Sequence, residues 1–95
     1  MQQIINEIHA HIVSRGGVHS GWYVGIASDP RDCLFSRHGV QEQGGHWIHR
    51  DAGTDTAARA IEKAFLDWGT KGGGGGGDAG TRHVYAYYIT ASTRE

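Results

Sequence analysis

Arginine and histidine account for most of the side chains in this sequence that could bind an anion. Of the nine Lys and Arg residues seven are Arg, and seven His accompany them. The planar guanidinium can form two parallel hydrogen bonds with a phosphate or a carboxylate, and the imidazole changes charge near neutral pH. Ten Asp and Glu residues bring the net charge to −1, which excludes a polybasic nucleic-acid coat. The composition therefore indicates an anionic ligand, with any nucleic-acid contact confined to a local patch.

A tyrosine lies among small residues on one face of a predicted strand. Over residues 21–27, bulky apolar residues alternate with Tyr23, Gly25 and Ala27, which is the period of a β-strand. Because Gly25 and Ala27 are small, we expect Tyr23 to look across a shallow depression where a ligand or another backbone can come close. The alternative is a half-buried tyrosine that only packs.

A short helix predicted to run from Pro30 to His38 carries several candidate side chains. Proline is favoured at the first helical position, and a glycine follows the last one. The cationic residues of this helix are Arg31, Arg37 and His38. His38 can be explained as complementing the helix dipole, and Cys33 as a small buried apolar residue. Cys33 is the only cysteine, so an internal disulfide is excluded, which fits a reducing compartment.

The elements that must position these residues are read from hydrophobic periodicity. Isoleucines at four-residue steps predict an amphipathic helix over residues 3–14, and β-branched and aromatic residues predict a strand over 82–90. A short strand is predicted over 46–50. A third helix, capped by Thr54 or Asp55, shows the strongest periodic signal of the chain.

These segments fit one small domain over residues 1–95. Their order, α-β-α-β-α-β, predicts an α/β (α+β) fold in which helices cover a three-stranded sheet. Eight of the 16 glycines lie in a glycine-rich loop at 69–80. Consecutive backbone N–H groups can cradle an anion, but this loop leaves a helix and enters a strand, the reverse of a phosphate-binding loop. We interpret it as a connector, with closure over a ligand as the alternative, and Arg82 after it adds local positive charge.

Two parts of the chain resemble the GIY-YIG nuclease superfamily. The segment Trp22–His38 resembles its second motif, in which a strand ending Tyr-hydrophobic-Gly is followed by a polar loop and a helix bearing Arg and His. The segment Thr56–Phe65 resembles a later helix that contributes one Glu. Tyr23 matches the tyrosine of the motif, Gly25 its glycine and Glu62 the carboxylate. The resemblance covers roughly residues 22–68, half of the chain.

The resemblance implies a metal-dependent nuclease that cleaves phosphodiester bonds of DNA or RNA. It implies a hydroxyl of Tyr23 near the attacking water, an Arg on the scissile phosphate, and Glu62 holding Mg²⁺ or Mn²⁺. A hard cation held by one carboxylate keeps several waters and leaves room for substrate oxygens. Gly25 and Arg82 are the expected substrate-binding residues. By itself, Glu62 at the border of an apolar stripe is also explained as a solvated helix former.

The sequence departs from the family pattern in two places. The catalytic Arg of the family falls at Cys33, and a thiol cannot replace a guanidinium; Arg37, Arg31 or His38 are the candidate substitutes, with Arg37 one α-helical turn beyond Cys33. The first strand of the family is also missing, because a helix occupies that region. The C-terminal strand is a plausible replacement: if it pairs beside residues 21–27, it restores the three-stranded sheet. It then brings either of two tyrosines to the vacant tyrosine position, namely Tyr85 or Tyr87.

The alternative to a nuclease is a domain of the same fold that no longer cuts and instead binds a protein, as a regulator or inhibitor. An interface patch is then expected from four aromatic residues: Trp22, Trp47, Tyr87 and Tyr88. An unrelated α+β binding module is a third reading. A second copy of the chain is a further candidate partner. We expect a cytoplasmic protein with no membrane partner, since neither a signal-like start nor an apolar run of spanning length is present.

Overall fold

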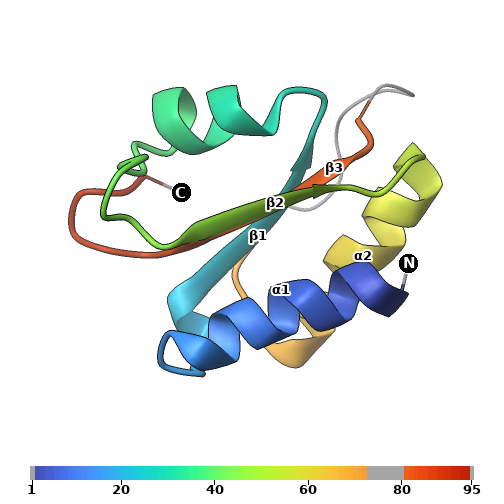
Figure 1. Cartoon of the computed structure of the whole chain (residues 1–95), viewed down its shortest axis with the longest axis horizontal. Helices are drawn as coiled ribbons and strands as arrows, with labels where there is room; N and C mark the ends of the chain where they lie inside the picture. The colour runs from blue at the N-terminus through green and yellow to red at the C-terminus, as the bar shows by residue number, and fades with distance from the viewer. Residues whose placement is uncertain (1, 73–80, 95) are drawn as a thin grey trace.

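Three antiparallel strands form a sheet at the centre of the molecule (Figure 1). The computed structural model describes residues 2–72 and 81–94. The strands are β1 (Trp22–Ala27), β2 (Trp47–Asp51) and β3 (His83–Tyr88), in the spatial order β1-β3-β2. The last strand of the chain therefore lies between the first two and pairs with both. The expected small α+β fold is confirmed, as is the pairing of the C-terminal strand beside residues 21–27.

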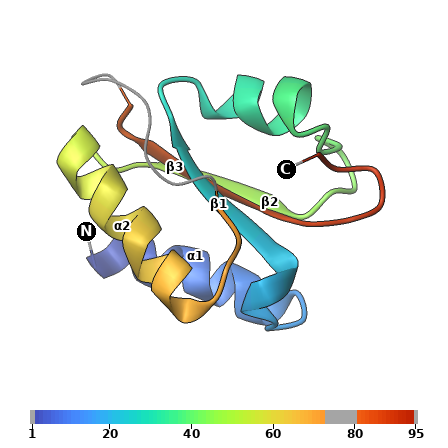
Figure 2. The same ribbon diagram turned by 180° about the vertical axis from the view of Figure 1, so that it is seen from behind.

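Two helices cover one face of this sheet (Figure 2). They are α1 (Gln2–Ser14) and α2 (Asp55–Trp68). Thr54 caps α2, since its side-chain oxygen accepts a hydrogen bond from the N–H of Ala57 at 3.1 Å. Gly69 ends the helix with a φ of +110°, a left-handed conformation that suits glycine.

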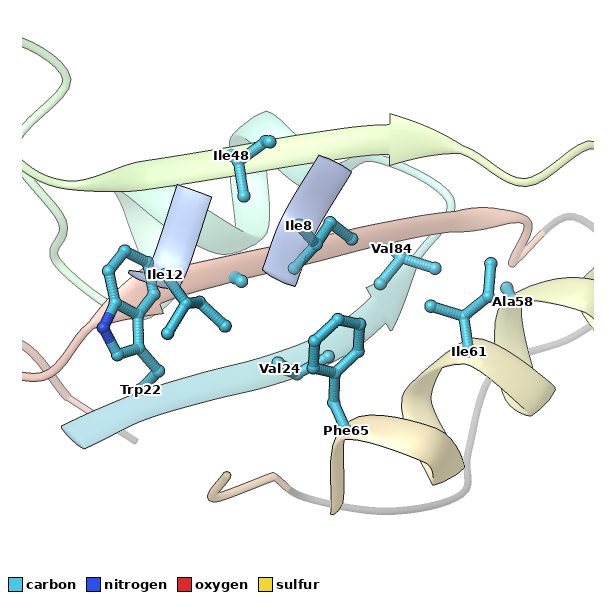
Figure 3. Close-up of a cluster of buried hydrophobic side chains, with 10 residues drawn as sticks. Ile8, Ile12, Trp22, Val24, Ile48, Ala58, Ile61, Phe65 and Val84 are labelled. Carbon is cyan, nitrogen blue, oxygen red and sulfur yellow. The ribbon is translucent and has the colours of Figure 1, made fainter. Parts of the chain in front are cut away.

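The main hydrophobic core lies between these helices and the sheet (Figure 3). Each strand and each helix contributes to it through the residues at its inward positions. These residues are Ile8, Ile12, Trp22, Val24, Ile48, Ala58, Ile61, Phe65, Val84 and Ala86. Trp22 in this core and Tyr87 on the opposite face are both fully buried. The expected aromatic interface patch is therefore wrong, because two of its four members have no accessible surface.

The opposite face of the sheet is covered by a short helix and by the C-terminal segment. This helix, η2 (Asp32–Arg37), has the wide turns of a π-helix rather than the α-helical turns expected. The N–H of His38 donates to the carbonyl of Cys33, five residues earlier, at 2.9 Å. One turn after Cys33, the residue hydrogen-bonded to it is therefore His38 and not Arg37.

The start of the glycine-rich stretch extends the sheet at the outer edge of β1. Lys71 forms a parallel bridge with Tyr23, and its carbonyl accepts from the N–H of Val24 at 2.9 Å. A Cβ at Gly72 would stand 2.7 Å from the Val24 carbonyl oxygen, so the strand can approach only a glycine there. Residues 73–80 of the expected loop lie outside the described residues. None of the helices among the described residues is long and apolar enough to cross a membrane.

Candidate functional site

Three tyrosines and a histidine pack together on the face of the sheet that η2 covers. Tyr23 comes from β1, Tyr85 and Tyr87 come from β3, and His38 follows η2. The Tyr23 ring centroid lies 5.2 Å from that of Tyr87, 6.3 Å from that of Tyr85 and 4.8 Å from that of His38. The register explains the first pair, since Tyr23 lies opposite Tyr87 and alternate residues of a strand share a face. We call these four residues the Tyr–His cluster.

Hydrogen bonds tie His38 into this cluster. Its Nε2 lies 2.8 Å from the hydroxyl of Tyr85, and its Nδ1 lies 2.5 Å from the carbonyl oxygen of Arg94 and 3.0 Å from the hydroxyl of Tyr87. Only 9% of His38 is exposed. His38 is the C-cap residue of η2, as expected of a residue at a helix end, and both of its ring nitrogens also have partners inside the fold.

Tyr85 fills the depression expected beside Tyr23. Gly25 lies opposite Tyr85 in the β1–β3 register. A Cβ added at Gly25 would stand 2.5 Å from the Tyr85 hydroxyl oxygen, so the phenol occupies the space that a side chain at position 25 would take. The role of Gly25 expected from the sequence, contact with a substrate, is thus corrected: Gly25 admits the neighbouring tyrosine, an aromatic ring covering a strand glycine.

The members of the cluster differ in their access to solvent. Tyr87 is fully buried and Tyr85 is 4% exposed, whereas Tyr23 is only partly buried. Burial raises the pKa of Tyr85, and the neighbouring Tyr23, Cys33, Tyr87 and Glu62 raise it further. Tyr85 therefore stays a neutral phenol that can donate a hydrogen bond, and Tyr23 is the tyrosine that a ligand can reach most readily.

Glu62 lies on the inward side of α2 and is 6% exposed. Burial raises the pKa of its carboxyl, and the nearby Arg59 opposes that shift. Glu62 has the smallest of the influences that raise the pKa of Tyr85, and α2, which carries it, covers the sheet face opposite the Tyr–His cluster. The interpretation of Glu62 as a solvated helix former is wrong, since such a residue would be exposed.

A single cation is the most that Glu62 could hold. The described residues contain no group of three or more His, Cys, Asp or Glu side chains that could bind a metal ion. Mg²⁺ needs no such cage, because it retains several waters and accepts one or two carboxylates together with phosphate oxygens. Glu62 is the one carboxylate among the expected site residues, and a cation would favour its charged form, which burial disfavours.

The arginines expected to contact a phosphate have acidic partners away from the cluster. Arg31 is paired with Glu42, and its guanidinium also lies over the Phe35 ring. Arg37 is paired with Asp32 at 3.4 Å, and 73% of its side chain is exposed. Arg82 lies 3.3 Å from Asp51. The reach of Arg37 back toward Cys33 was expected from α-helical turns, whereas the π-helical turn brings His38 to the cluster instead.

Cys33 lies close enough to the cluster to influence it. The thiol raises the pKa of Tyr85. Burial in turn raises the pKa of the Cys33 thiol, while Arg37 opposes the shift. A thiol with a raised pKa is uncharged at neutral pH and cannot offset the negative charge of a phosphate.

The residue that sequence reasoning missed is Arg94. Its carbonyl accepts from the ring of His38 and from the hydroxyl of Tyr87, and its main chain lies against His38. Arg94 lies 56 positions after His38 in the chain, and the contact uses a backbone carbonyl, so no pattern of residue types predicts it. A hollow of about 390 Å³ lies beside the same C-terminal segment, lined by residues of 40–46 and 88–93. Neither Tyr23 nor Glu62 lines it.

Comparisons of the chain with protein-family models, with curated proteins and with solved structures gave no match.

Proposed function

We propose that this chain is a metal-dependent nuclease domain of the GIY-YIG type, which cleaves phosphodiester bonds in DNA or RNA. The observation that supports this proposal most is the meeting of Tyr23 with Tyr85, Tyr87 and His38 on one face of the sheet. Two of these tyrosines come from the strand that was expected to stand in for the missing first strand of the family. Glu62, the expected metal ligand, is buried on α2 and has a small influence on the pKa of Tyr85.

Each side chain has a role that its surroundings support. Tyr23 is the least buried tyrosine of the cluster and would orient the attacking water or accept its proton. Tyr85 and His38 form a buried hydrogen-bonded pair behind it, at 2.8 Å. Glu62 would hold Mg²⁺ or Mn²⁺, which when bound lowers the pKa of a water and offsets charge on phosphate oxygens.

Cys33 makes the proposal testable by gain of activity. If Cys33 stands where the family has its phosphate-binding Arg, then Cys33→Arg supplies the missing guanidinium next to the cluster. We expect Cys33→Arg to raise the cleavage rate about 100-fold or more, the usual worth of one group that stabilises transition-state charge. Cys33→Met is the matched control, because it enlarges the side chain without adding charge.

The experiment is a cleavage assay on labelled single- and double-stranded DNA and RNA with Mg²⁺ or Mn²⁺. It compares the wild type, Cys33→Arg, Cys33→Met, and Cys33→Arg combined with Glu62→Gln or Tyr23→Phe. We expect activity in Cys33→Arg and its loss on adding Glu62→Gln. Glu62→Gln should stay folded, because it removes a carboxylate whose burial disfavours its charge. Absence of cleavage in every folded variant would overturn the nuclease proposal.

A second candidate is a protein-binding regulator or inhibitor of the same fold that no longer cuts. The uncharged Cys33 thiol at the expected Arg position favours it, together with the ion pairs that occupy Arg31 and Arg37. In this case the wild type is inactive while Cys33→Arg regains cleavage, which would identify a lost activity on a retained site. We also propose a cytoplasmic location, in which the single cysteine stays reduced.

A further inference from the structure

The two ring nitrogens of His38 face different kinds of partner. Nδ1 lies 2.5 Å from the Arg94 carbonyl oxygen, which can only accept a hydrogen bond. The proton of the neutral ring must therefore be on Nδ1, leaving a lone pair on Nε2. Tyr85, whose hydroxyl lies 2.8 Å from Nε2, is then the donor in that bond.

The third hydroxyl in the network agrees with this assignment. Tyr87 donates to the Arg94 carbonyl oxygen at 3.2 Å, so its own oxygen is available to the proton on Nδ1, 3.0 Å away. The Arg94 carbonyl thus accepts from two buried donors at once. Were the ring proton on Nε2 instead, Nδ1 would point a lone pair at a carbonyl lone pair 2.5 Å away, which is repulsive.

The side chain of Arg94 holds this carbonyl in place. Its Nε donates to the carbonyl of Arg37 at 3.3 Å and its terminal nitrogen donates to the carbonyl of Ser36 at 3.1 Å. The last carbonyls of a helix have no partner within the helix, so Arg94 caps η2. Its main-chain N–H also donates to the carbonyl of His38 at 2.6 Å. Four hydrogen bonds of one residue therefore meet at the end of η2.

A glycine lets the C-terminal segment pass this close. Gly39 has a φ of +70°, and a Cβ there would stand 3.3 Å from the Ser92 carbonyl oxygen and 3.7 Å from the Arg94 guanidinium carbon. A side chain at this position would be strained by the backbone angle and would crowd the segment. The turn after η2 is therefore shaped to receive Arg94.

We propose that Arg94 is a positioning residue. By capping η2 with its guanidinium, Arg94 holds its own carbonyl against Nδ1 of His38 and fixes the tautomer in which Nε2 accepts a hydrogen bond from the Tyr85 hydroxyl. The hydrogen bond from Tyr85 to Nε2 then has a fixed direction beside the Tyr23 ring, whose centroid lies 4.8 Å from that of His38. Only the use of this hydrogen bond in cleavage rests on the proposed function; the tautomer does not.

The direct test is the tautomer of His38, measured by long-range ¹H–¹⁵N correlation spectroscopy of the full chain at alkaline pH. His38→Gln assigns the signals. In the wild type we expect Nδ1 protonated and Nε2 unprotonated. In Arg94→Ala we expect the ratio of the tautomers to shift about tenfold toward a proton on Nε2, the effect of losing roughly one hydrogen bond. Arg94→Lys should restore part of the preference, and Arg15→Ala, a surface control, should leave it unchanged.

Two results would overturn the proposal: a wild-type ring protonated on Nε2, or an Arg94→Ala ring with the wild-type tautomer ratio. Tyr85→Phe separates Arg94 from the other partner of the ring, because it removes the donor to Nε2 and leaves the Arg94 carbonyl, so the proton should stay on Nδ1. A proton that moves in Tyr85→Phe but not in Arg94→Ala would assign the tautomer to Tyr85 and contradict the inference. Should Arg94→Ala fail to fold, Arg94→Lys and Tyr85→Phe still decide.

Activity provides an independent readout in whichever variant cleaves. Arg94→Ala should lower kcat with little change in KM, since Arg94 acts through His38 and has no substrate contact. A failed cleavage assay with the expected tautomer shift would reject the nuclease and keep the positioning role. Cleavage activity with an unchanged tautomer ratio in Arg94→Ala would support the nuclease proposal and reject the positioning role of Arg94.

Discussion

At the scale of single residues, a glycine and a tyrosine on neighbouring strands decide what the candidate site looks like. Gly25 and Tyr85 lie opposite each other, and the phenol occupies the volume above the glycine. This placement carries the Tyr85 hydroxyl to His38, 47 positions away in sequence. Gly25 and Tyr85 are separate features of the sequence, but they form one packing unit. The absence of a side chain at Gly25 makes room for the Tyr85 ring.

Replacing Gly25 by alanine should displace the Tyr85 ring and break its bond to His38. The new Cβ would stand 2.5 Å from the phenol oxygen, which neither backbone nor ring can accept without moving. We expect a loss of about 1–3 kcal/mol in the free energy of unfolding, the usual cost of overpacking, measured by urea denaturation. Gly21→Ala is the matched control, because its Cβ would meet the Tyr88 ring at an ordinary 3.4 Å. Equal losses in the two variants would contradict this account.

At the scale of elements, the wide turns of η2 select which side chain reaches the Tyr–His cluster. An α-helix through Cys33 would bring Arg37 to the next turn on the same face, whereas the bond from His38 to Cys33 spans five residues. Arg37 is consequently turned out to solvent beside Asp32. The extra residue in this π-helical turn therefore places the imidazole of His38, rather than the guanidinium of Arg37, at the cluster.

The helix that carries Glu62 depends on its cap. The Thr54 side chain satisfies the N–H of Ala57, which no helical carbonyl can reach. Thr54→Ala should therefore lower the free energy of unfolding by about 1 kcal/mol in urea denaturation. Thr56→Ala, an exposed position within the same helix, should change it by less than about 0.5 kcal/mol or raise it slightly. A larger loss from Thr56→Ala than from Thr54→Ala would refute the capping role.

At the scale of the whole molecule, the sheet separates an apolar core from a polar aromatic layer. The face under α1 and α2 holds aliphatic side chains with Trp22 and Phe65, while the other face holds the tyrosines that bond to His38. The same strands contribute to the apolar core and to the Tyr–His cluster because successive side chains of a strand point to opposite faces of the sheet. The apolar core and the Tyr–His cluster therefore lie on opposite sides of the same three strands, whereas Glu62 is carried by α2 on the core side.

The packing of α1 on the sheet should make the molecule less stable in mild acid. Burial against Trp22, together with the charges of Arg15, Arg50 and His46, lowers the pKa of His11 from 6.5 to about 4. Between these two values the unfolded chain binds a proton that the folded chain does not, so stability falls as the pH drops from about 6.5 toward 4.

His11→Gln should remove part of this pH dependence. We expect the loss of unfolding free energy between pH 7 and pH 5 to shrink by about 1 kcal/mol relative to the wild type, with the side chain's partial exposure limiting the effect. Urea denaturation at both pH values measures it. His19 and His49 also have pKa values lowered mainly by burial, so some acid sensitivity should remain in the variant. If the unfolding free energies of His11→Gln and the wild type changed equally with pH, His11 would have no part in the acid sensitivity.

The amino-acid sequence by itself determined the helices, the strands and the two faces of β1. Periodicity and end signals are local, so residues 3–14, the cap at Thr54 and the alternation around Tyr23 were predictable from neighbours a few positions away. Its strand content also allowed the C-terminal strand to be placed beside residues 21–27. This placement followed from the strand count, because the C-terminal strand replaces the first strand of the family that the chain resembles, rather than from any one residue.

Only the tertiary structure decided what these residues contact. The filling of the Gly25 depression, the burial of Glu62 and the bonds of Arg94 to η2 all depend on segments that the sheet brings together from distant parts of the chain. The π-turn at His38 is local, yet its hydrogen bonds leave no mark in the apolar spacing. Backbone carbonyls have no residue type, and a histidine tautomer set by a carbonyl is therefore visible only once the chain is folded.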